Sequence, residues 1–280
     1  MADPGAKIGG AGAGVAASYR LAGTGRLLAE DERLSLLEEV FDTVSIRRRS
    51  LVQAGWRCLE VGAGRGSMAV WLAERVGRSG RVVATDIDVT YLERLDVRNL
   101  EARQHNILDD PLDPLEPGSF DVVCSRLMLF HLVGRQEEAI RRMVLCLKPG
   151  GLLIDEDADW GMTAPVDPSH PLFASFHRAW RAGDWWASRG YDPRFGRTLP
   201  ALFERSGLET IHHEASSEVV RGGSPWARWY RESLDVIAQA EGAQTAQQID
   251  EHRTITSALA DPSLLFLREL LHACSGRRPA

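Results

Sequence analysis

Residues 58–67, Cys-Leu-Glu-Val-Gly-Ala-Gly-Arg-Gly-Ser, place three alternating glycines directly after a short apolar run that contains one acid. This pattern predicts a buried strand, a tight turn and a helix over about 67–76. Glycine is needed where the backbone takes a positive φ or lies against a ligand. Because a helix that starts at such a turn points its free amide groups into it, the segment predicts a ligand site.

The spacing of the glycines distinguishes two classes of cofactor site. A dinucleotide site uses G-x-G-x-x-G/A, in which the third small residue lets the helix pack closely on the strand. Counted from Gly62, that position holds Ser67, so this fit is partial. The segment instead follows E-x-G-x-G-x-G from Glu60 to Gly66. In this it resembles motif I of the class I S-adenosylmethionine-dependent methyltransferases.

Two further motifs follow in the order that this family has them. Asp86 ends an apolar run about 20 residues later, where its carboxylate could accept both ribose hydroxyls or cap the next helix. By resemblance, Asn106 bonds the adenine amino group and Ile107 packs on the ring, although the family often has Asp at the first position. Residues 118–132 look like the fourth strand and its loop, and 147–154 like the turn into the fifth strand.

These five elements, over about residues 50–157, imply an α/β, Rossmann-like class I methyltransferase fold. Its sheet is seven-stranded and mostly parallel, with helices on both faces. The implied cofactor is S-adenosyl-L-methionine, with S-adenosyl-L-homocysteine as product. The residues that the resemblance assigns to cofactor binding are Glu60, Gly62, Ala63, Gly64, Gly66, Asp86, Ile87, Asn106, Ile107, Ser125 and Arg126. Glu60 could hold the cofactor's ammonium group or accept amide protons that fix the glycine turn.

The remaining segments are assigned from periodicity and from Gly and Pro positions. The predicted units are a flexible tail (1–17), an N-terminal helical cap (18–51), the cofactor-binding core (52–157), a helical lid insertion with a return helix (158–206), and final strands with C-terminal helices (207–280). A strand hairpin is expected over 208–221 and a last helix over about 262–274. The run Arg47-Arg48-Arg49 is interpreted as a solvated helix end rather than a phosphate site.

The candidate catalytic residues are groups that could remove a proton from an acceptor: His131, Glu156, Asp157 and His177. Four carboxylates between Asp155 and Asp159 would repel one another if all were buried, so we expect most to face water or some to serve a ligand. The candidate substrate-binding residues form an aromatic set: Tyr19, Trp160, Phe176, His177, Trp180, Trp185, Trp186, Trp226 and Tyr230. Such a set suits a flat organic molecule, although some of these side chains would serve only as core.

The composition of the chain limits the kinds of molecule that it is expected to bind. The net charge of −6 argues against a nucleic-acid partner and favours a small-molecule substrate. Four cysteines without a C-x-x-C pair indicate free thiols in a reducing compartment. No run is apolar enough to span a bilayer, so we predict a cytoplasmic protein without a membrane partner. We expect no metal, and a homodimer stays open.

The predicted activity is transfer of a methyl group to an O or N atom of a small organic molecule by in-line displacement. The segments Trp71–Gly77 and Glu156–Trp160 resemble actinobacterial methyltransferases that tailor natural products, which implies an antibiotic intermediate as acceptor. Two alternatives stay open. One is a non-methylating protein or cyclase on the same fold. The other, a dinucleotide-dependent oxidoreductase, is disfavoured by Ser67 and by the absence of a Tyr-x-x-x-Lys pair.

Overall fold

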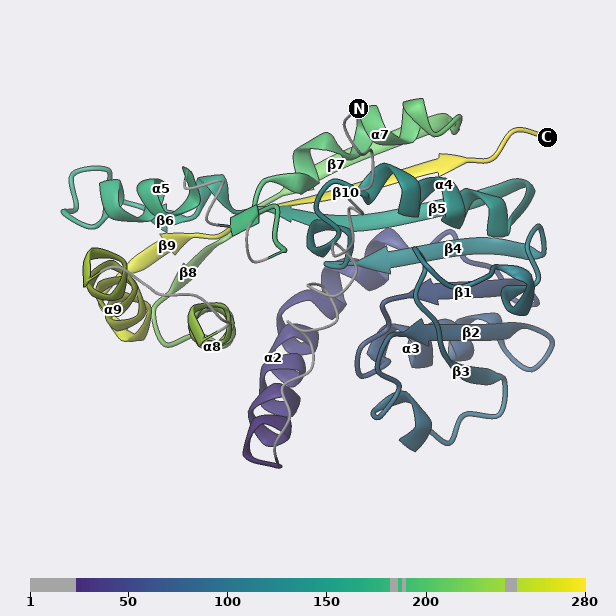
Figure 1. The fold of residues 1–280 in the computed structure, drawn as a ribbon, viewed down its shortest axis with the longest axis horizontal. Coiled ribbons are helices and arrows are strands. Elements are labelled where there is room, and N and C mark those ends of the chain that lie inside the picture. The colour runs from purple at the N-terminus through teal and green to yellow at the C-terminus, as the bar shows by residue number, and fades with distance from the viewer. Residues whose placement is uncertain (1–23, 182–185, 188–189, 240–245) are drawn as a thin grey trace, which may run out of the picture.

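The computed structural model describes residues 24–181, 186–187, 190–239 and 246–280. Its centre is a seven-stranded sheet in the order β3-β2-β1-β4-β5-β10-β7 (Figure 1). The strands are β1 (Arg57–Val61), β2 (Arg81–Asp86), β3 (Leu100–Gln104), β4 (Phe120–Arg126), β5 (Leu147–Asp159), β7 (Glu209–Ser216) and β10 (Leu270–Arg277). The first five are parallel, and β10 runs antiparallel to both β5 and β7. The predicted fold class is confirmed.

Near-continuous apolar runs explain the central strands. β1 and β4 are buried along most of their length, as expected where both faces of a parallel sheet are covered. α3 (Ser67–Val76) packs on one face through five buried side chains, among them Leu72 and Val76. Its bounds match the predicted helix. α4 (Gln136–Cys146) and α7 (Leu199–Arg205) pack on the sheet through Ile140, Met143 and Phe203.

The other helices form a second layer beyond the carboxyl ends of the parallel strands (Figure 1). They are α2 (Thr24–Arg48), α5 (Phe173–Arg181), α8 (Pro225–Gln239) and α9 (Ala246–Ala260). A small antiparallel sheet joins them, in the order β6 (Ala164–Pro165), β9 (Leu265–Leu267) and β8 (Val219–Arg221). Short 3-10 turns, η1 to η5, cover Leu92–Arg94, Asp113–Leu115, Leu129–His131, Trp160–Met162 and Phe195–Thr198. α2 and α8 pack together, and Phe41 meets Trp229 edge-on at 5.1 Å between ring centroids.

Three expectations about the C-terminal half are wrong. The helix predicted over about 262–274 is instead β9 and β10, because a short apolar run fits a buried strand as well as a helix. The predicted hairpin does not form, since β7 joins the large sheet through β10 while β8 joins the small one. Residues 158 and 159, which we expected to open a lid, are instead the last two residues of β5.

The interpretation of Arg47–Arg49 as a solvated helix end holds for the exposed Arg47 but is wrong for Arg48 and Arg49. Arg49 is fully buried, with its Nη1 atom 2.9 Å from Glu156 Oε2 and its Nη2 donating to the Ser125 carbonyl. Ser45 donates a hydrogen bond to the same Glu156 carboxylate. Arg48 holds Glu214 of β7 at 2.6 Å. The end of α2 is therefore fixed onto β4 and β5 by buried groups, and onto β7 by the ion pair of Arg48 with the exposed Glu214.

The acids between Asp155 and Asp159 are buried, contrary to the expectation that most face water. Two of them depend on arginines. Burial alone would raise the pKa of Glu156, but Arg49 and Ser45 hold this pKa below its usual value. Asp159 pairs with Arg197 of η5. The charges of Glu156 and Asp159 are thus offset by Arg49 and Arg197. Burial instead raises the pKa of Asp155 to about 7 and, together with repulsion from Asp155, raises the pKa of Asp157.

We expect Arg49→Met to lower the free energy of unfolding by about 3–5 kcal/mol, because it leaves the Glu156 carboxylate buried without its cation. Arg47→Met is the matched control, since Arg47 lies in the same run but is exposed. Denaturant unfolding at neutral pH measures both. The pair's contribution should be complete above the ordinary pKa of glutamate and be lost as the pH falls through the lowered pKa of Glu156. A loss below about 1 kcal/mol would contradict the assigned role of the pair.

Candidate functional site

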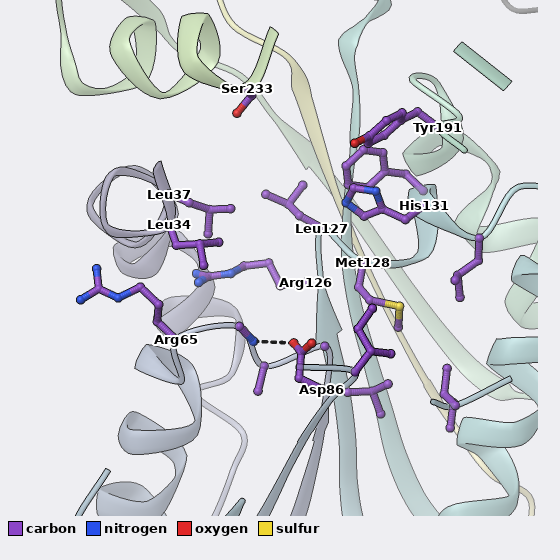
Figure 2. A pocket seen from close by; sticks show the side chains of 18 of the residues that line it. Leu34, Leu37, Arg65, Asp86, Arg126, Leu127, Met128, His131, Tyr191 and Ser233 are labelled. Atoms are coloured by element: carbon purple, nitrogen blue, oxygen red, sulfur yellow. Dashed lines mark hydrogen bonds between the residues drawn. The ribbon is translucent and has the colours of Figure 1, made fainter. Parts of the chain in front are cut away.

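A cavity of about 770 Å³ lies at the carboxyl ends of the parallel strands, between the sheet and the helices α2 and α8. Ligands of open α/β sheets bind at this edge, and the volume lies within the range of about 300–1,000 Å³ for small-molecule sites. Figure 2 shows Leu34 and Leu37 of α2 facing Leu127 across the space, with His131 and Tyr191 at one end. The wall therefore combines the sheet edge with the second layer of helices.

The glycine turn forms the floor of one half. Gly62, Gly64 and Gly66 all have positive φ. A Cβ atom at Gly62 would lie 2.5 Å from Cγ of Met128, and one at Gly66 would lie 2.6 Å from Cδ1 of Leu95. These two positions thus require glycine for packing as well as for φ. Gly62, Ala63 and Gly64 line the cavity, whereas Gly66 lies behind it at the start of α3.

Asp86 closes this turn from the neighbouring strand. Its Oδ2 atom accepts a hydrogen bond from the Gly64 amide at 2.9 Å (Figure 2). Oδ1 accepts a hydrogen bond from the Asp88 amide at 3.1 Å. Burial raises the pKa of Asp86. Asp86 does not cap the next helical turn, because η1 begins after Tyr91 without a side-chain cap. Asp86 lines the cavity. A carboxylate that binds a cofactor ribose, as the sequence resemblance implies for Asp86, would have to lie there.

Asn106 and Ile107 lie further along the cavity wall. Ile107 is almost fully buried and supplies an apolar surface. The Asn106 side chain donates to Asp109 at 2.9 Å and accepts from the Leu108 amide at 3.0 Å, so it also orders its own loop. Ile87, at the end of β2, completes this part of the wall.

Charged groups surround the opposite side of the turn. Glu60 is 3% exposed and lines the cavity, and its Oε2 atom has no hydrogen-bond partner within the described residues. Burial raises the pKa of Glu60 to about 7. Arg126 also lines the cavity and donates to Asp42 of α2 at 2.7 Å. Ser125 lies off the cavity, where its hydroxyl donates to Asp155. Ser125 can therefore contribute its backbone but not its hydroxyl to a ligand at this edge.

Aromatic side chains line the other half. His131 lies between Phe130 and Tyr191, with ring centroids 3.9 Å and 4.9 Å away. The turn before η5 is held here because the Asp192 amide donates to the Phe130 carbonyl at 2.8 Å. Trp160 and Tyr230 are parallel at 5.6 Å, and Trp229 lies 5.5 Å from Trp160. Burial, with a smaller effect of Arg33, lowers the pKa of His131 to about 3. The imidazole is therefore neutral at physiological pH.

Of the four catalytic candidates, only His131 lines the cavity. Glu156 is engaged by Arg49 and Ser45. Asp157 accepts hydrogen bonds from the Phe130 and Ala158 amides. His177 packs against Phe173 on α5 at 4.5 Å between ring centroids. The geometry thus gives Glu156, Asp157 and His177 structural surroundings in place of the catalytic ones we expected.

Some of the aromatic candidates for substrate binding line the cavity, whereas others lie in the core. Trp160, Trp186 and Tyr230 line the cavity. Phe176 is core, packed on Phe266, and Trp226 is core, with its indole N–H donating to Glu269 at 2.7 Å. Tyr19 and Trp185 lie outside the described residues, as does the side chain of Trp180.

The sequence analysis missed much of the wall, namely Arg33, Leu34, Leu37, Glu38, Leu127, Met128, Tyr191 and Ser233. The helical periodicity of Leu34 and Leu37 indicated an inward face but not what it faced.

Within the described ranges, no three His, Cys, Asp or Glu side chains cluster in a way that could hold a metal ion. In the same residues, no helix has the length and apolar character that crossing a membrane requires.

Part of this chain, which includes the glycine turn, is similar to known methyltransferases. Residues 59–155 match a family model described as a methyltransferase domain. The ubiquinone/menaquinone biosynthesis C-methyltransferase UbiE of Enterobacter sp. (strain 638) is 28% identical over 180 residues, which cover 58% of this chain and 70% of that protein. Methyltransferase str3 of Strobilurus tenacellus is 30% identical over 151 residues, covering 54% of this chain and 52% of that protein.

A solved structure extends the similarity to the whole fold. Phosphoethanolamine N-methyltransferase 2 of Haemonchus contortus, in complex with phosphomonomethylethanolamine and S-adenosylhomocysteine, is similar with a TM-score of 0.52 and 16% identity. The match covers 89% of this chain and 53% of that one. This chain therefore spans about half the length of two of these three proteins.

We expect the imidazole of His131 to stay neutral between about pH 5 and 8, because its pKa of about 3 lies below that window. Imidazole ¹⁵N chemical shifts measured across this range should not change for His131, whose signal is assigned by its loss in His131→Asn. A midpoint near the ordinary value of about 6.5 would show that water reaches the ring and that the cavity is more open than described.

Proposed function

We propose that this chain, whose residues 59–155 form a class I S-adenosylmethionine-dependent methyltransferase domain, transfers the methyl group to a small, flat organic acceptor. The observation that carries the proposal is the continuity of one cavity, which joins the glycine turn and Asp86 to a wall of Trp160, Trp186 and Tyr230. A cofactor and an acceptor can share such a space without water between them.

The residues present fit this cofactor. Asp86 would accept the ribose hydroxyls, Ile87 and Ile107 would cover the adenine, and Glu60 offers a buried carboxylate oxygen to the ammonium group. Arg126 would hold the carboxylate end. When bound, S-adenosylmethionine supplies an activated methyl group on a sulfonium, so the protein chiefly aligns the acceptor and excludes water.

The pKa and the position of the candidate bases limit which kinds of acceptor the site can methylate. His131 has a pKa of about 3, so it can accept a hydrogen bond but cannot withdraw a proton from an alcohol. Glu156 and Asp157 are off the cavity. We therefore propose an acceptor that needs positioning rather than a strong base, either an acidic phenol or enol, methylated on oxygen, or a neutral aromatic amine, methylated on nitrogen. The proton leaves from the acceptor to solvent.

In this arrangement the side chains around His131 orient the acceptor. The imidazole and the Tyr191 hydroxyl border the same end of the cavity (Figure 2), and Trp160 and Tyr230 supply flat surfaces on which a ring can stack. A secondary-metabolite intermediate of the antibiotic type, as the sequence resemblance implies, has this chemistry. The homodimer stays a prediction.

The direct test incubates the protein with methyl-labelled S-adenosylmethionine and a panel of phenols, enols and aromatic amines. Label transfer with stoichiometric S-adenosylhomocysteine is the expected result, and NMR of the product identifies the methylated atom. Methylation on carbon, which the name of UbiE describes for that protein, would overturn the O- or N-assignment. Cofactor binding without transfer to any class would favour a non-methylating protein.

Asp86→Ala should weaken S-adenosylhomocysteine binding more than tenfold, since hydrogen bonds to a charged group contribute about 1.5–3 kcal/mol. Asp88→Ala is the control, because Asp88 holds Thr90 outside the cavity. Asp86→Asn keeps an acceptor for the Gly64 amide and separates loss of ribose binding from loss of the turn. Calorimetry measures all three variants, and unchanged affinity in Asp86→Ala would show that the ribose lies elsewhere.

His131→Ala should lower turnover of an identified acceptor by about a hundredfold, while S-adenosylhomocysteine affinity changes less than about twofold. His131→Asn should recover part of the rate, because an amide can still align the acceptor. His212→Ala, exposed on the edge strand β7, should match the parent. Equal losses of affinity and turnover would instead assign His131 to packing of the cavity wall.

A further inference from the structure

Glu38 lies on α2 above the glycine turn and lines the cavity. Asp42, one helical turn later, points to the same place, since it accepts a hydrogen bond from the Ser67 hydroxyl at 3.1 Å. Ser67 lines the cavity as well and lies beside the Glu38 side chain. Unlike Asp42, Glu38 borders the empty space itself. The helix α2 thus brings a carboxylate to the cavity wall beside the start of α3.

The cations near Glu38 are shared with other acids. Arg65 Nη1 lies 3.7 Å from Glu38 Oε2, but the same guanidinium is 3.3 Å from Asp31 and donates to its carbonyl. Arg126 is bonded to Asp42 at 2.7 Å. Because each arginine also pairs with another acid, neither fully neutralises the Glu38 carboxylate, whose negative charge therefore acts on the cavity.

A second carboxylate meets this space from the sheet. Glu60 is 3% exposed, lines the cavity, and leaves Oε2 without a hydrogen-bond partner within the described residues. A buried carboxylate oxygen that lacks a partner is costly unless a donor or a cation completes it. Glu38 from α2 and Glu60 from β1 therefore both favour a cationic group at this end of the cavity.

We propose, on the basis of the proposed function, that Glu38 makes the cavity discriminate S-adenosylmethionine from S-adenosylhomocysteine. The two molecules share the ammonium and carboxylate groups, but only the first carries a positive sulfonium. A carboxylate beside the methionine end therefore stabilises the methyl donor more than its neutral thioether product. The same charge favours exchange of product for fresh donor after each turnover.

The test is calorimetric titration at about pH 8 with S-adenosylmethionine and, separately, with S-adenosylhomocysteine. The quantity compared is the ratio of the two dissociation constants. In Glu38→Gln this preference for the donor should fall about tenfold, since a carboxylate with a 22% exposed side chain, a few ångströms from a cation, contributes about that much. Glu39→Gln, the adjacent exposed position on α2, should keep the parent ratio.

The outcomes separate the two proposals. An unchanged ratio in Glu38→Gln, with both molecules still bound, would overturn this inference alone. An equal loss of affinity for both would also overturn it, and would assign Glu38 to holding Ser67. If the parent protein binds neither molecule, the proposed function fails and the inference fails with it. Thermal unfolding of each variant confirms that the compared proteins are folded.

Discussion

The ion pair between Arg49 and Glu156 is the contact on which the geometry of the cavity depends. It joins the end of α2 to the middle of β5, beneath the strand ends that carry the cofactor residues. Because both groups are fully buried, neither can leave its partner without a large desolvation penalty. The position of α2 over the glycine turn is therefore fixed, and with it the positions of Leu34, Leu37 and Glu38.

The cavity has two halves. One lies at the glycine turn and Asp86, where the cofactor is proposed to bind, and the other is lined by aromatic side chains, where the acceptor is proposed to bind. The cofactor half is built from backbone that the parallel sheet itself determines: positive-φ glycines, strand ends and one carboxylate that bonds the turn. The acceptor half is built from side chains of α2, α8 and the turns around Trp160 and Tyr191. Aromatic packing rather than hydrogen bonding defines this half, which suits recognition of shape and flatness more than of a particular polar group.

The sequence predicted the strand, glycine turn and helix over 57–76 well because their signals are local, whereas the cofactor contacts assigned to residues there stay predictions. The glycine spacing, Asp86 and the start of α3 at Ser67 are each readable within a few residues. The burial of Arg49 was not readable, since its partner Glu156 lies far along the chain and only the topology brings the two together. The strand at Leu270 was mistaken for a helix because its environment, between β5 and β7, is likewise non-local. Tyr191 gave no signal for the same reason.

Two of the connections that build the cavity wall leave the large sheet at neighbouring positions, from the ends of β5 and β7. Asp159 of β5 pairs with Leu270, and Leu271 pairs with Ser216 of β7. The two stretches of chain that build the acceptor wall, after Asp159 and after Ser216, therefore depart from neighbouring points on one sheet edge, and the second also returns there. A loop whose ends are already adjacent can lengthen at a cost of only about 0.6 kcal/mol per doubling. Insertions and replacements in these stretches can reshape the acceptor wall while the strand order and the glycine turn stay as they are.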